Sequence, residues 1–351
     1  MQNWHQFLQD PTQHTKTAVI ENHQVIHFGD LIAERKSLAQ DTIICDLSHL
    51  GLLEIEGEDA LNFLQGQVTN DIKLLNGNNA QYTAYCTPKG RMLALFLAFS
   101  HYGHVHLQMP KELLEAIAKR LKMYVMRSKV TIKDTSETIV RLGLNGPKAT
   151  ALLTSLFTMV PTQDYELVSL ENGAIIKLPG AQPRYQIFTS LENAPSVWTA
   201  LTKIATPVGA ESWEWLEIQA GIPTVTSRTQ EEFVPQMLNL DALNAINYKK
   251  GCYTGQEIVA RTHYLGKVKR RTQLAHINTD VAPIIGDDIM DENHQAIGKI
   301  VRAAPALETG YDVLAECRLD NIDVESAIQH NIFWNSIALT IKPLPYALAE
   351  T

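Results

Sequence analysis

The order of apolar and polar positions predicts a chain that mixes strands and helices. Three β-type runs, QYTAYC, MLALFLAF and HVHLQM, lie between residues 81 and 109 and are separated by turn signals. The following stretch, KELLEAIAKRLKMYVMR, predicts a helix with one apolar face formed by Leu113, Leu114, Ile117, Leu121, Tyr124 and Val125. Strands followed by a packing helix indicate an α+β unit.

Further along the chain the same alternation continues and then changes. Three stretches are typical of strands: TIVRLGLNG, GAIIKLP and RYQIFTS. Residues 147–157 predict a helix, and WEWLEIQAGIP predicts a further helix that ends at Gly221 and Pro223. After Arg271 short β-type pieces and turns predict a small antiparallel barrel or sandwich. The prediction is therefore an α+β region over residues 1–265 and a β-domain over 270–351, with the boundary near 265–275.

Composition favours a folded protein of the cytoplasm. The chain has 351 residues, of which 45% are hydrophobic, enough for two or three cores. Its four cysteines are scattered without a CxxC pair, as expected in a reducing compartment, and they offer no zinc or iron–sulfur ligand pattern. The amino terminus resembles no leader peptide, and the longest apolar run, Met92 to Phe99, is shorter than the ~20 residues of a membrane helix. We expect no membrane association.

Charge is unevenly distributed. The formal net charge of −8 argues against a general nucleic-acid coat. The segment from Lys249 to Arg271, however, holds seven basic residues and one acidic residue, a charge of +6 that leaves −14 for the rest. Its basic residues are Lys249, Lys250, Arg261, Lys267, Lys269, Arg270 and Arg271. The segment is either a phosphate-contacting patch or a solvated linker.

Cys252 lies within this basic segment. Thr254 and Glu257 have the spacing of a capping box, which predicts a helix from Gly255 with Cys252 just before its amino terminus. The helix dipole and the preceding residues, Lys249 and Lys250, would favour the reactive thiolate. The alternative is a small buried apolar residue, since free cysteines are commonly buried.

Other chemical motifs are weak. His101, His104 and His106 alternate in a predicted strand, but no carboxylate or cysteine accompanies them at a metal-ligand spacing, so no metal site is expected. The chain has no P-loop, no G-x-G-x-x-G and no H-E-x-x-H motif. Nucleotide-dependent chemistry is not indicated.

The stretch KGCYTGQEIVAR, residues 250–261, resembles the signature of the YgfZ family, folate-binding relatives of the glycine-cleavage T-protein. The resemblance extends to GEDALNFLQGQVTND (57–71), CTPKGRM (86–92), WEWLEIQAGIPTV, FVPQMLNLDAL and LPYALAE (344–350). It implies a three-part ring of two interleaved α+β units and a carboxy-terminal antiparallel β-barrel, around a folate channel. It also implies a role in supporting iron–sulfur enzymes, including enzymes that thiolate tRNA.

One departure from the T-protein concerns the segment after Gly90. There the T-protein has an acidic pair, one member of which is needed for aminomethyl transfer to tetrahydrofolate, whereas this chain has Met92, Leu93, Ala94 and Leu95. Aliphatic side chains cannot replace a charge-stabilising group. Aminomethyltransferase activity is therefore disfavoured.

The resemblance places a folate-contacting tryptophan at Trp213, where ordinary core packing is the alternative. Trp215 cannot share the same helical face. Glu217, Arg228 and Gln236 are weaker candidates for pterin or tail contacts, and Lys89, Arg91 or the basic segment could meet the anionic tail of tetrahydrofolate or a derivative.

The leading hypothesis is a folate-binding accessory protein for iron–sulfur cluster assembly or repair. In it Cys252, assisted by Lys250, acts in thiol exchange, persulfide handling or transient cluster contact, with iron–sulfur enzymes or assembly proteins as partners. The alternatives are a folate-dependent one-carbon transferase and a tRNA-binding modification factor that contacts RNA through Lys249–Arg271.

Overall fold

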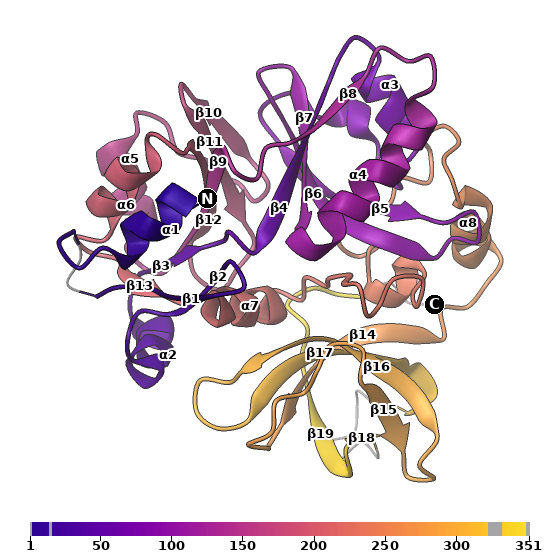
Figure 1. The fold of residues 1–351 in the computed structure, drawn as a ribbon. Helices are drawn as coiled ribbons and strands as arrows, with labels where there is room; N and C mark the ends of the chain where they lie inside the picture. The colour runs from indigo at the N-terminus through magenta and orange to yellow at the C-terminus, as the bar shows by residue number, and fades with distance from the viewer. Residues whose placement is uncertain (1, 14–15, 322–331, 349–351) are drawn as a thin grey trace. The chain divides into compact units, whose positions relative to one another are not determined.

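The largest open sheet among the described residues has six strands. The computed structural model describes residues 2–13, 16–321 and 332–348 (Figure 1). The sheet has the order β10 (Leu167–Leu170), β11 (Gly173–Leu178), β12 (Arg184–Ser190), β9 (Ile139–Asn145), β3 (Ile43–Asp46) and β13 (Thr206–Val208). All neighbouring pairs are antiparallel except β3 and β13. Apolar residues of α1 (Gln2–Gln9), α5 (Ala149–Leu156) and α6 (Ala194–Leu201) share a core with this sheet.

The second sheet contains the three strands predicted between residues 81 and 109. Its order is β5 (Ala80–Cys86), β6 (Met92–His101), β7 (His104–Pro110), β4 (Leu50–Glu56) and β8 (Thr131–Asp134). Helix α4 (Lys111–Val125) packs on β4, β7 and β8, and it buries Leu113, Leu114, Ile117 and Leu121 as predicted. Tyr124 is exposed, so the buried face of α4 is shorter than the predicted one.

The predicted carboxy-terminal β-domain is a closed barrel, which resolves the choice between barrel and sandwich (Figure 1). Its order is β14 (Arg270–Ile277), β17 (Tyr311–Arg318), β16 (Ala296–Pro305), β15 (Asp288–Asp291), β18 (Ile332–Trp334) and β19 (Ile337–Lys342), and β19 pairs with β14 to close it. Every described pair in the barrel is antiparallel. The predicted domain 270–351 and the stretch 344–350 include residues outside those that the structure describes.

The remaining elements are short. They are the hairpin β1 (Val19–Glu21) and β2 (Gln24–His27), the helices α2 (Leu31–Gln40), α3 (Ala60–Gln65), α7 (Ala210–Gln219) and α8 (Gln256–Tyr264), and the 3₁₀ turns η1 (Ile72–Leu74), η2 (Pro235–Leu238) and η3 (Leu319–Asn321). Helix α7 ends before Gly221, whose φ of +66° fits the predicted glycine stop. Within the described part of the chain, no helix is both long and apolar enough to cross a membrane.

The fold divides into two units that are interleaved along the sequence. Unit 1 comprises residues 1–63, 73–81 and 97–213, and unit 2 comprises residues 64–72, 82–96 and 214–351. The divisions fall inside α3, η1, β5, β6 and α7. The α+β class with a carboxy-terminal barrel is thus confirmed, while the boundary at residues 265–270 stays a prediction.

Candidate functional site around Cys252

Helix α8 follows the Cys252 loop, as predicted, but it begins differently. The helix starts at Gln256, and its N-cap is Gly255 with φ of +86° and no side-chain cap. The predicted capping box of Thr254 and Glu257 is therefore wrong, because a glycine in the left-handed conformation takes the cap position. A Cβ atom at Gly255 would lie 2.5 Å from the carbonyl oxygen of Thr87, so this position accepts only glycine without rearrangement.

The turn between β5 and β6 contacts the start of α8. Gly90 in this turn has φ of +69°, and its amide donates to the carbonyl of Thr87 at 2.9 Å. A Cβ atom at Gly90 would lie 2.9 Å from the Cβ of Ile258. The CTPKGRM stretch and the KGCYTGQE stretch are thus packed against each other within unit 2, and two glycines permit the approach.

Lys250 fastens the Cys252 loop to a third stretch. Its side chain is buried, and its ammonium donates to the carbonyls of Val68 at 2.6 Å and Asn70 at 2.8 Å. The ammonium also lies 5.1 Å from the ring centroid of Tyr253, a cation–π contact. Burial lowers the pKa of Lys250 to about 8, opposed by the charge of Asp71. Lys250 therefore anchors the loop to residues 68–70.

Cys252 itself is exposed, whereas the other three cysteines are buried. Burial raises the pKa of Cys86 and of Cys317 to about 12, and it also raises that of Cys45. Those three thiols stay protonated and inaccessible near neutral pH. The alternative of a small buried apolar residue is wrong for Cys252, which solvent reaches four positions before the first residue of α8.

The basic segment presents fewer free charges than its sequence suggests. Arg271 is 2% exposed and binds Asp241 through two nitrogen–oxygen contacts of 2.5 and 2.9 Å. Arg270 forms a two-point ion pair with Glu316 at 2.5 and 2.8 Å. With Lys250 buried, the basic residues that remain exposed are Lys249, Arg261, Lys267 and Lys269.

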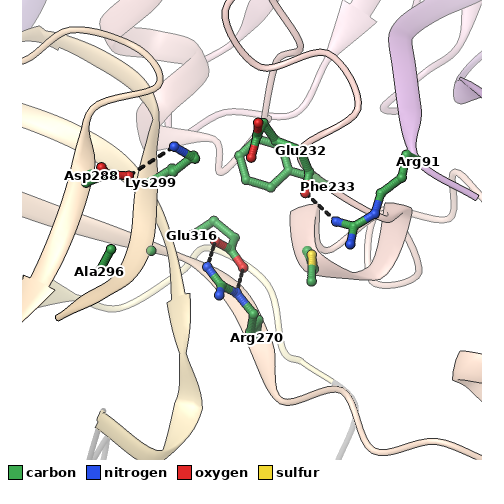
Figure 2. A pocket seen from close by; sticks show the side chains of 10 residues that line it. Arg91, Glu232, Phe233, Arg270, Asp288, Ala296, Lys299 and Glu316 are labelled. Atoms are coloured by element: carbon green, nitrogen blue, oxygen red, sulfur yellow. Dashed lines mark hydrogen bonds and ion pairs between the residues drawn. The ribbon is translucent and has the colours of Figure 1, made fainter.

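A cavity of about 300 Å³ in unit 2 has Arg270 and further residues of the barrel in its wall (Figure 2). It is lined by Arg91, Glu232, Phe233, Met237, Arg270, Asp288, Ala296, Gly298, Lys299 and Glu316. Arg270 is paired with Glu316, Lys299 with Asp288 at 3.0 Å, and Arg91 donates to the backbone carbonyl of Glu232. Three cations and three carboxylates line it, so the cavity carries no excess of positive charge for an anionic tail.

Trp213 lies in unit 1 and is 3% exposed. Its ring covers Gly143 so closely that a Cβ atom there would clash with the ring. The buried guanidinium of Arg184 lies 5.3 Å from the centroid of the ring. Trp215 differs, since its indole nitrogen donates to Asp312 at 2.9 Å within unit 2. The two tryptophan side chains thus make different contacts, as expected for residues two positions apart on a helix.

The other three folate candidates belong to unit 2. Glu217 is buried, and its charge together with that of Glu214 raises the pKa of Arg302 against the lowering effect of burial. Arg228 is mostly exposed, 3.8 Å from Asp287. Gln236 is fully buried and donates to the carbonyl of Val259 in α8 at 2.7 Å, a structural contact. Their convergence with Trp213 on one ligand stays a prediction.

The predicted histidine strand lies beside carboxylates of a neighbouring strand, which the spacing of residues in the sequence did not reveal. His104 and His106 share a face of β7, as expected, and Nδ1 of His104 lies 3.5 Å from a carboxylate oxygen of Glu54 in β4. Burial, with smaller effects of His101 and His104, lowers the pKa of His106 to about 4. The alternation of Glu54 and Glu56 in LEIEGE was the available signal, but it required knowing that β4 pairs with β7.

Comparisons with known proteins agree with this fold. Residues 6–250 match the family model of the GCVT N-terminal domain. The chain is similar to the tRNA-modifying protein YgfZ of Colwellia psychrerythraea (36% identity, covering 76% of this chain and 82% of the relative) and to that of Enterobacter sp. (33%, covering 88% and 94%).

Among solved structures, the glycine cleavage system aminomethyltransferase T from Bartonella henselae has the same fold. The two structures superpose with a TM-score of 0.71 at 15% sequence identity, and the match covers 92% of this chain and 91% of that chain. The matched domain and the curated relatives lead to one assignment. The chain belongs to the YgfZ family, within the wider group of proteins that carry a GCVT N-terminal domain.

Proposed function

We propose that this chain is a folate-binding accessory protein of tRNA modification that supports iron–sulfur enzymes through the thiol of Cys252. The observation that carries the proposal is the exposed thiol of Cys252 on a loop that Lys250 fastens to the carbonyls of Val68 and Asn70. A thiolate is the form of cysteine that attacks, exchanges or ligates metal. An anchored, exposed loop can present this group to a client protein.

Lys250 acts as a positioning residue in this proposal. Its ammonium is directed at backbone carbonyls, so its main effect on Cys252 is to hold the loop. Gly255 and Gly90 add to the same effect, because they let the start of α8, which follows the loop, pack on the β5–β6 turn.

Support for the folate part comes from the family. The match to the GCVT N-terminal domain and the resemblance to the folate-binding YgfZ family support this part, whereas the relatives' name, tRNA-modifying protein, supports the tRNA part. Trp213 is the proposed pterin contact, with Glu217, Arg228 and Gln236 as further candidates. One-carbon transfer is the weaker alternative, because Met92 to Leu95 are buried aliphatic residues of β6 where the T-protein has its acidic pair.

A tRNA contact, if direct, falls on the exposed cations of the basic segment. Lys249, Arg261, Lys267 and Lys269 are available for phosphate contacts, whereas Arg270 and Arg271 are engaged in ion pairs.

Replacement of Cys252 tests the proposal. In cells that lack the native protein, the amount of a thiolated tRNA nucleoside made by an iron–sulfur enzyme is measured by mass spectrometry. The unaltered chain and a Cys317→Ala variant are expected to restore the nucleoside, and Cys252→Ser is expected to reduce it at least tenfold at equal protein level. Full restoration by Cys252→Ser would refute the thiol role.

A further inference from the structure

The strands of the five-stranded sheet that belong to unit 1 gather metal-binding side chains on one face, outside the Cys252 site. Glu54 of β4 pairs directly with His106 of β7, which pairs on its other side with Phe99 of β6, and His101 pairs with His104. Directly paired residues share a face, and so do residues two apart on one strand. Glu54, Glu56, His104 and His106 therefore project from the same face.

The potential ligand atoms are close together. Nδ1 of His104 lies 3.5 Å from Oε2 of Glu54 and 4.0 Å from Oε2 of Glu56, and Nε2 of His106 lies 3.9 Å from Oε2 of Glu54. The ligand atoms of Glu54, Glu56 and His104 all lie within 4.8 Å of one another. Ligands of a tetrahedral zinc ion are about 3.4 Å apart, so small side-chain rotations bring these atoms to that spacing.

His106 provides a second, independent observation. Its side chain is 7% exposed, and its Nδ1 atom has no hydrogen-bond partner among the described residues. The ring stacks on Phe99 at 5.0 Å between centroids and lines a cavity of about 340 Å³. Nε2, the ring nitrogen that faces the carboxylates, lies 3.9 Å from Glu54, beyond hydrogen-bond distance. Buried polar atoms in native proteins are ordinarily satisfied, so a buried imidazole in this state, with Nε2 directed at Glu54, suits an additional partner at the cluster.

The surroundings also suit a bound cation. Among the described residues, Lys133 forms an ion pair with Glu56, its ammonium 2.6 Å from Oε1. The other oxygen of Glu56, Oε2, is the one near Nδ1 of His104. Such an outer contact orients a ligating carboxylate. The mixture of imidazole and carboxylate favours zinc over calcium or magnesium, which prefer oxygen ligands alone.

We propose that Glu54, Glu56 and His104, with His106 beside them, bind one zinc ion at the rim of this cavity. The zinc proposal does not depend on the proposed role of Cys252, because the two sites share no residue.

Zinc titration of the EDTA-treated, desalted full chain tests the site. Calorimetry is expected to show one tight equivalent in the unaltered protein and in Cys252→Ser, which excludes zinc held by the exposed thiol. Glu54→Gln and His104→Gln are each expected to weaken binding at least tenfold. His294→Asn, a matched loss of an exposed histidine in a turn of the barrel, is expected to leave it unchanged.

Cobalt added to the unaltered protein gives a readout that does not depend on the folding of any variant. We expect the visible bands of tetrahedral cobalt without a thiolate charge-transfer band. Absence of zinc binding by the unaltered chain, a thiolate band, or an equivalent that persists in a folded Glu54→Gln/His104→Gln double variant would each overturn the proposal.

Discussion

Lys250 and Arg271 show how far a residue's environment can depart from its sequence context. Both lie in a run of basic residues, where solvated side chains are expected. Lys250 instead donates to two backbone carbonyls, and Arg271 is buried and paired with Asp241. Cys252 shows the opposite outcome, because its exposure agrees with its Gly-flanked, polar context. The charge of a side chain can be taken from sequence, but its burial depends on partners such as Val68 that are remote in the chain.

Replacement of Lys250 by Met is expected to lower the free energy of unfolding at pH 7 by about 1–3 kcal/mol, because two buried carbonyls lose their donor. The exposed neighbour provides the control, since Lys249→Met is expected to change it by less than about 0.5 kcal/mol. Urea unfolding measures both. Equal effects of the two variants would contradict the anchoring role.

The burial of Lys250 also predicts a pH dependence. The pKa of Lys250 is about 8 in the folded chain, against 10.5 for an unperturbed lysine, so between these values the unfolded chain keeps a proton that the native chain releases. Stability from this group therefore rises with pH, by about 1.5 kcal/mol between pH 8 and about pH 9.5. The difference in unfolding free energy between the unaltered chain and Lys250→Met is expected to widen by that amount, and a constant difference would be the contrary result.

At the scale of elements, prediction succeeded where a pattern was long and local. Strands β5, β6 and β7 and helices α4 and α5 follow directly from apolar periodicity. Strands such as β13, with three residues, carry too little pattern to be recognised. The capping box failed because Thr254 and Glu257 have the right spacing, but the close approach of Thr87 requires glycine at the cap. Likewise Glu54 and His104 meet only through the pairing of β4 with β7.

Two glycines near Cys252 allow a matched test of the α8 cap. Gly255→Ala places a Cβ atom against the Thr87 carbonyl at positive φ and is expected to cost about 2 kcal/mol or more of stability. Gly251→Ala, where a Cβ atom would meet nothing within 4 Å, is expected to cost less than about 0.5 kcal/mol. Chemical denaturation distinguishes the two, and a neutral Gly255→Ala would show that the cap tolerates a side chain.

At the scale of the whole molecule, four stretches that are far apart in sequence meet within unit 2. The Cys252 loop is held by residues 68–70 through Lys250, its helix packs on the turn at Gly90, and Gln236 donates to that helix at Val259. These are stretches on which the family resemblance rests. The resemblance therefore identifies a contiguous structure, although the sequence alone could not say that its members touch.

Binding of tetrahydrofolate is the most direct test of whether this protein shares a folate site, and not only a fold, with the T-protein. Under anaerobic conditions, calorimetric titration of tetrahydrofolate into the purified chain is expected to show one bound equivalent. Trp213→Leu is expected to weaken binding at least tenfold, while Trp215→Leu, a matched tryptophan loss on the same helix, is expected to leave it unchanged. Absence of binding to the unaltered chain would contradict the proposed folate function.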